Sequence, residues 1–322
     1  MTHIQRRALL TAPVLLPWTA MGQVPWRPGR PVTLVVPFAA GSGTDGVGRI
    51  VAPLLAEAIG ATVLVENRAG ANGTIAAVAV ARAPADGHTL FSATNTTHSA
   101  NPALMRRQDY DPQSDFTPIA RLGTPIFLLV VGPTVSARDV AGFIAWARGR
   151  DGRLNYASAN AIGVVGMATL ARLAGFNATN VPYRSAPQAL TDLIGGRVDA
   201  MMIDITASIG HVRDGRLHAL AVTTRDRSAL MPDLPSLHEA GVTGFDVSAW
   251  MGVFGPAALP TDVVATLGAA LPAIVARPEV QARLATVGFE AGGAGPQALG
   301  ALVASELPRW AALVRAAGIE PE

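Results

Sequence analysis

Cysteine and lysine are both absent from this chain of 322 residues, and only 15% of its residues are charged. Without cysteine the chain cannot use a thiol nucleophile, form a disulfide or carry a lipid on a cysteine. Without lysine it cannot form a Schiff base or place a Walker A lysine on a phosphate. These absences exclude several classes of enzyme before any motif is considered.

Arginine supplies all 25 basic residues, yet the formal net charge is only +2. The arginines are scattered, without a basic stripe or interleaved aromatic residues, and this argues against a nucleic-acid partner. Enzyme signatures are also scarce, because the six histidines lack metal-ligand spacing and the sequence contains no G-x-S-x-G. We therefore expect no catalytic residues, no metal and no cofactor.

Residues 1–22 are typical of a signal peptide. Arg6 and Arg7 precede an apolar stretch from Ala8 to Trp18, and small residues place a cleavage site after Gly22. The stretch is too short for a stable membrane helix, and no later segment offers an uninterrupted membrane-spanning run. An uncleaved N-terminal helix is the alternative. The sequence thus predicts a soluble protein that is exported to the periplasm, by the general or the twin-arginine route.

Strand-like and helix-like segments alternate after a proline-rich leader, which predicts an α/β protein with mostly parallel sheets flanked by helices. After Met231 the order changes to a turn-rich segment, one strand and three helices. Such an order arises when a chain builds one domain, crosses to a second and returns to finish the first. We expect a first lobe of residues 31–125 and 232–322, and a second lobe of residues 126–231.

Two segments share one design, in which a hydrophobic strand runs into a small-residue turn that opens a helix. The first, VTLVVPFAAGSGTD, begins at Val32, and the second, NVPYRSAPQALTD, begins at Asn180. The free N–H groups of a helix N-terminus form an anion site without a charged side chain. Capture of a carboxylate between two lobes is therefore the leading hypothesis.

Residues 41–46 satisfy the pattern G-x-G-x-x-G, and Glu66 ends the next strand, as in a dinucleotide-binding fingerprint. However, Pro37 to Ala40 separate the strand from the first glycine, where that fingerprint requires a tight turn. An exported protein also meets little dinucleotide. We interpret the glycines as a close approach of the backbone to a small anion, with Thr44 or Asp45 capping the helix.

Five ordered blocks of the sequence resemble the Bug family, the extracytoplasmic solute receptors of tripartite tricarboxylate transporters. The resemblance runs from about Pro31 to Gly318, nearly the whole mature chain. It implies a two-lobed, type II periplasmic-binding fold that acts as a monomer and holds a small carboxylate in its cleft. The blocks are PVTLVVPFAAGSGTD, VENRAGANGTIAAVAVARAPADGHTLF, VPYRSAPQALTDLIGGRVD, LHALAVTTRDRSALMPDLPSLHEAGV and WMGVFGPAALP.

Carried over motif by motif, the resemblance also implies the ligand-binding residues. They lie in the turn after the first strand, after the third strand and in the second lobe, and they are Phe38, Ala39, Gly41, Asp45, Thr94, Asn95, Ser158, Tyr183, Ser185 and Asp204.

One helix start departs from the family pattern. Ile162, Val164 and Val165 stand where the family has hydroxyl groups and a histidine. We therefore expect a ligand with a less polar body than citrate, such as an aromatic or longer-chain carboxylate. Ser185 and Ala186 replace the usual glycine-containing turn, so this anion pocket should be narrower.

The expected function is capture of a small organic carboxylate and its presentation to the subunits of a membrane permease, with no chemistry on the ligand. Two alternatives stay open. The chain could be a receptor subunit that reports to a sensor, or a secreted enzyme on the same fold. The sequence does not separate transport from sensing, because both use the same closure of the cleft.

Overall fold

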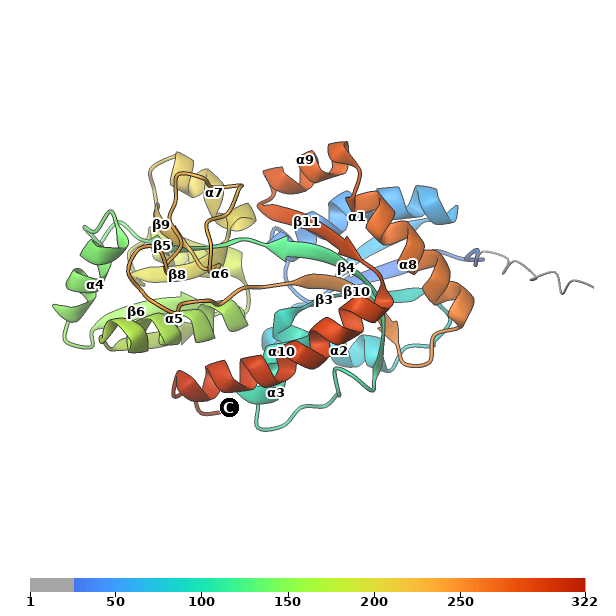
Figure 1. Cartoon of the computed structure of the whole chain (residues 1–322), viewed down its shortest axis with the longest axis horizontal. Coiled ribbons are helices and arrows are strands. Elements are labelled where there is room, and N and C mark those ends of the chain that lie inside the picture. Colours follow the sequence, from blue (N-terminus) through green and yellow to red (C-terminus); the bar gives the residue numbers. More distant parts are fainter. Residues whose placement is uncertain (1–25, 322) are drawn as a thin grey trace, which may run out of the picture.

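The computed structural model describes residues 26–321, which form two lobes side by side (Figure 1). The expected signal peptide lies outside the described residues. Each lobe has one β-sheet with helices packed on it, as the alternation of strand and helix patterns predicted.

Lobe one is built on a six-stranded sheet with the order β11-β4-β10-β3-β1-β2. Its first part contains β1 (Val32–Val36), α1 (Gly43–Ile59), β2 (Val63–Asn67), η1 (Ala71–Gly73), α2 (Thr74–Ala81), β3 (Thr89–Thr94), η2 (Thr96–Ala100), α3 (Asn101–Leu104) and β4 (Phe116–Pro125). Its last part contains β10 (Met251–Pro256), α8 (Thr261–Val275), α9 (Pro278–Thr286), β11 (Phe289–Ala294) and α10 (Pro296–Ala316).

Lobe two is built on a five-stranded sheet with the order β7-β6-β8-β5-β9. Its elements are β5 (Phe127–Val131), α4 (Val140–Arg148), β6 (Leu154–Ser158), α5 (Ala161–Ala174), β7 (Ala178–Pro182), α6 (Ala186–Ile194), β8 (Ala200–Asp204), α7 (Ile205–Arg213) and β9 (His218–Val222). Strand β8 is buried along its whole length, which explains why its first four residues are all apolar.

Both sheets are mixed, whereas the sequence predicted mostly parallel sheets. Strands β1, β2 and β3 run parallel in lobe one, and β6, β7 and β8 run parallel in lobe two. The crossing strands β5 and β10 pair antiparallel with their neighbours. They run the other way because each enters its sheet from the opposite lobe.

The return from lobe two to lobe one comes later in the chain than the expected boundary at residues 231–232. After β9 the chain stays with lobe two, where Leu237, Val242, Phe245 and Val247 are buried in its core. The backbone N–H of Leu237 donates to Val222 O of β9 at 3.0 Å. These apolar side chains keep the segment on lobe two until β10 begins.

Helix α10 belongs to both lobes. Leu299 and Val303 in its first half pack in the core of lobe one, and Trp310 and Val314 in its second half pack in the core of lobe two. The indole Nε1 of the fully buried Trp310 donates to the Glu306 carboxylate at 3.0 Å. Figure 1 shows the helix running beneath both lobes, so the lobes share a helix as well as crossing strands.

Within residues 26–321, no single helix is long and apolar enough to cross a membrane. The pair α8 and α9 meets that test only when taken together, and the two helices are bent by 74°.

His98 lies in η2, a π-helical turn, and is completely buried among aromatic rings. Its ring centroid is 4.2 Å from that of Phe254 and 4.6 Å from that of Phe116. Burial lowers the pKa of His98 to about 3, because a charged imidazole would lose its hydration there. The residue is therefore a neutral core side chain, and it supports the turn that follows β3.

We predict that the His98→Gln variant takes up one proton fewer than the wild type when it unfolds in mild acid. The pKa of His98 is about 3 in the folded protein and 6.5 for a solvated histidine, so near pH 5 unfolding takes up a proton. The contribution of His98 to the free energy of unfolding is therefore present above pH 6.5 and is lost as the pH falls towards 3. This residue should contribute a slope of about 1.4 kcal/mol per pH unit to the free energy of unfolding.

Urea unfolding between pH 4.5 and 6.5 measures that slope, with the partly exposed His218→Gln as the matched control. Equal slopes for wild type and His98→Gln would contradict the prediction.

Candidate functional site

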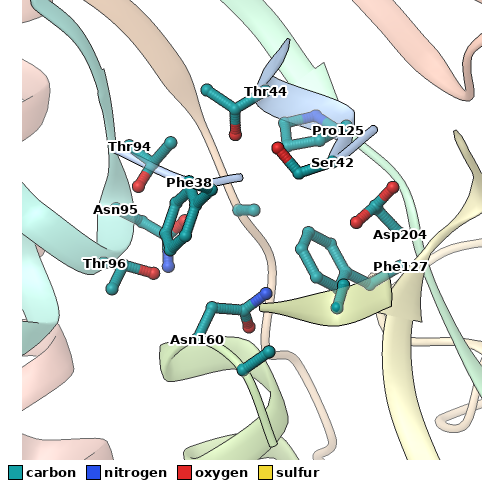
Figure 2. Close-up of a pocket in the computed structure, with 14 residues that line it drawn as sticks. Phe38, Ser42, Thr44, Thr94, Asn95, Thr96, Pro125, Phe127, Asn160 and Asp204 are labelled. Carbon is teal, nitrogen blue, oxygen red and sulfur yellow. The ribbon is translucent and has the colours of Figure 1, made fainter. Parts of the chain in front are cut away.

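A cavity lies between the lobes (Figure 2). Helices α1, α5, α6 and α7 all begin at its walls, and the first N–H groups of a helix have no partner within that helix. The cavity therefore lies at the positive ends of four helix dipoles. It is lined by Phe38, Ser42, Gly43, Thr44, Thr94, Asn95, Thr96, Pro125, Phe127, Ala159, Asn160, Ala186, Asp204 and Ala249.

The turn before α1 is held together by Asp45. Its carboxylate accepts hydrogen bonds from Gly41 N and Asn67 Nδ2, both at 3.0 Å, and pairs with Arg49 at 3.0 Å. Burial alone would raise the pKa of Asp45, but the hydrogen bonds from Arg49, Gly41 and Asn67 outweigh it and keep the pKa below its usual value. The carboxylate thus stabilises the turn and does not line the cavity.

Asp204 reaches from lobe two to the start of α1. It is the N-cap of α7, where its Oδ1 accepts from Ala207 N at 3.0 Å. A Cβ atom on Gly43 would lie only 2.8 Å from the same oxygen, so only glycine allows this approach. Burial raises the pKa of Asp204, and the N–H groups of Ala207 and Gly43 act in the opposite direction. A carboxylate of the protein therefore faces the anion site that the sequence predicted at α1.

The end of β3 carries polar groups that have no partner among the described residues. Thr94 Oγ1 and Asn95 Nδ2 are buried without a hydrogen bond, and both residues line the cavity. Thr96 Oγ1 accepts from Ala161 N at 3.3 Å, which joins η2 of lobe one to the start of α5 in lobe two. Buried polar groups normally have partners, so this edge is suited to a polar ligand group.

Sequence reasoning missed Asn160, the N-cap of α5. Its Oδ1 accepts from Gly163 N at 3.1 Å, and the residue lines the cavity. The signal was present in the sequence, because an asparagine directly before an apolar helical stretch is a typical helix start.

Apolar side chains form the middle of the cavity, but they differ from those that the sequence suggested. Phe38 and Phe127 project into it from the two lobes, and Pro125 lies beside Ser42 (Figure 2). Ile162 and Val165 are instead buried in the core of lobe two, on the inner face of α5. The apolar body expected for the ligand thus has matching walls, although the residues that suggested it lie elsewhere.

Of the expected binding residues, the structure brings Phe38, Thr94, Asn95 and Asp204 together around this cavity. Tyr183 lies outside it, and its hydroxyl donates to Asp192 Oδ2 at 2.7 Å. Together with Arg184, Tyr183 lines a neighbouring cavity that also includes Phe38.

The remaining expected residues shape the turns around the cavity. Gly41 has a positive φ of 81° and lines a separate groove, and Ala39 precedes it in the same turn. Ser158 ends β6 and is buried, with its carbonyl accepting from Tyr183 N at 2.7 Å. Ser185 is the N-cap of α6, without a side-chain cap.

Comparison with known proteins gives one consistent result. The family model described as "Tripartite tricarboxylate transporter family receptor" matches residues 47–319. The structure titled "R. palustris Rpa4515 with adipate" has a TM-score of 0.89 and 35% identity, over 92% of this chain and 99% of that one. The periplasmic binding protein BugD has a TM-score of 0.86 and 33% identity, over 92% and 100%. MatC (Rpa3494) from Rhodopseudomonas palustris, with bound malate, has a TM-score of 0.82 and 35% identity, over 89% and 99%.

We predict that Gly43→Ala lowers the melting temperature, whereas Gly46→Ala does not. The added Cβ at position 43 would lie 2.8 Å from Asp204, while at position 46 it would lie 3.4 Å from Thr206 Cγ2. The contact at position 43 forces the lobes apart and should lower the free energy of unfolding by about 1–3 kcal/mol. The second replaces a glycine inside the same helix, which by itself favours the folded state. Thermal unfolding compares the two variants, and equal melting temperatures would contradict the close approach of Asp204.

Proposed function

This chain belongs to the tripartite tricarboxylate transporter receptor family, and on that premise we propose that it captures a small organic carboxylate in the cavity between its lobes. The observation that carries the proposal is the pair of buried, unpartnered polar groups Thr94 Oγ1 and Asn95 Nδ2 at a cavity surrounded by helix starts. Related structures titled with adipate and with malate support the same class of ligand.

In the proposed complex, neutral hydrogen-bond donors hold the carboxylate of the ligand. Among the described residues that line the cavity, none is an arginine or a histidine. Thr94, Asn95 and Asn160 supply hydroxyl and amide groups, and the surrounding helices direct the positive ends of their dipoles at the cavity. Phe38 and Phe127 cover the body of the ligand, which suits an aliphatic or aromatic chain.

We further propose that the protein works in the periplasm as a monomer and presents its bound form to the membrane subunits of a permease. The family description and the similarity to a periplasmic binding protein support this role. Since these relatives are binding proteins, the ligand is passed on unchanged.

We predict that small carboxylates raise the melting temperature and that neutral sugars do not. A ligand at 100 times its dissociation constant raises the free energy of unfolding by about 2.7 kcal/mol if it binds only the folded state. A thermal-shift screen should include mono-, di- and tricarboxylates and aromatic acids. If sugars shift the transition while every carboxylate leaves it unchanged, the proposed function is wrong.

We also predict that the mature protein begins at or near Gln23. The basis is the basic start, apolar stretch and small residues of the first 22 positions. Intact-mass measurement on periplasmic material gives the cleavage site directly. Recovery of the uncleaved chain from the membrane fraction would overturn the proposed export.

A further inference from the structure

The two sides of the cavity differ in hydrogen-bonding character. On the side of β3 lie Thr94 and Asn95, whose hydroxyl and amide groups have no partner among the described residues. On the opposite side lies the carboxylate of Asp204 (Figure 2). Within the described lining, Asp204 is the only residue with an ionisable side chain. The cavity therefore has a donor side and an acidic side.

The position of Asp204 is fixed by its surroundings. Its Oδ1 caps α7 through Ala207 N, and the start of α1 at Gly43 approaches the same atom from the other lobe. The neighbouring Thr206 hydroxyl donates to Val287 O of lobe one, which ties the start of α7 to that lobe. The carboxylate cannot swing out of the cavity without losing its cap.

An ionised carboxylate accepts hydrogen bonds and donates none. A ligand that places its own carboxylate at Thr94 and Asn95 presents its other end to Asp204. A second ionised carboxylate there would meet a like charge in a buried site, without a cation between them. A hydroxyl or amino group would instead donate a hydrogen bond to Asp204.

We propose that Asp204 determines the ligand specificity of the cavity, by selecting carboxylates whose far end is a hydrogen-bond donor over dicarboxylates of the same length. This inference rests on the proposed function and defines its ligand class as hydroxy or amino monocarboxylates. The geometry gives Asp204 a role beyond helix capping, because the α7 cap alone would not require a carboxylate to face the cavity.

Matched pairs of acids test this inference by titration calorimetry. The pairs are adipate with 6-hydroxyhexanoate, glutarate with 5-hydroxypentanoate, and terephthalate with 4-(hydroxymethyl)benzoate. Burial raises the pKa of Asp204. The titrations are therefore run at about pH 8, far above the pKa of a free carboxylic acid. In each pair that binds, the hydroxy acid should bind about tenfold or more tightly than the diacid.

Asp204→Asn should reduce the ratio of the affinities for the hydroxy acid and the diacid, since asparagine keeps the helix cap and removes the charge. Asp204→Ser serves as a second capping variant if the first does not fold. Asp139→Asn is the matched control, because Asp139 caps α4 through Gly142 N and does not line the cavity. It should leave the preference unchanged.

Three results would overturn the proposal. Wild-type protein could bind the diacid as tightly as its hydroxy partner, or the preference could persist unchanged in Asp204→Asn and Asp204→Ser. Either result removes the role of Asp204 and leaves carboxylate capture intact. Failure of every carboxylate in the thermal-shift screen would instead remove the proposed function and this inference together.

Discussion

The structure depends on how the unpaired N–H groups at the starts of α1, α5 and α7 are satisfied around one cavity. Ser42, Asn160 and Asp204 each cap the helix that they begin. Two further contacts cross between the lobes, from Ala161 N to Thr96 Oγ1 and from the start of α1 to Asp204. Because parallel strands in both sheets end at this edge, the helix starts converge there and must find partners in the other lobe or in a ligand.

The contacts between the lobes differ on the two sides of the cavity. On one side Leu104 of lobe one and Trp310 of α10 share a buried apolar core with lobe two. On the other side the contacts are partly polar: Ser228 Oγ donates to Glu290 Oε1 at 2.6 Å, and Ile205 of lobe two also packs against Gly288 of lobe one. Separating the apolar side would expose core side chains to water, whereas separating the polar side exchanges hydrogen bonds for water. The shared helix and its buried side chains therefore oppose opening on their own side of the cavity.

The sequence predicted the parallel strands well, because β1 and β8 are largely buried and each is apolar at all but one position. It missed β4 and β11, because prolines and an arginine in β4 and two glycines in β11 blur the alternation. The two lobes and the alternation of elements followed from pattern alone. The late return of the chain did not, because apolar residues such as Leu237 and Phe245 pack on lobe two without forming a strand.

The directions of the side chains at the expected site could not be predicted, since motif position does not fix them. Asp45 lies in the correct turn, but its carboxylate is satisfied by Gly41 N and Asn67. The glycine at the close approach is Gly43, and its importance comes from Asp204 in the other lobe. Contacts between positions so far apart in the chain depend on how the lobes pack, which local patterns do not contain.

The same packing decides which donors are left for a ligand. The start of α1 faces Asp204, and the first N–H of α5 is bonded to Thr96. Thr94 Oγ1 and Asn95 Nδ2 at the end of β3 keep their hydrogen-bonding capacity. An anion binds most favourably where hydrogen-bond donors are free and the protein's own carboxylate is distant. The orientation of a bound carboxylate thus follows from the way the protein has already satisfied its helix starts.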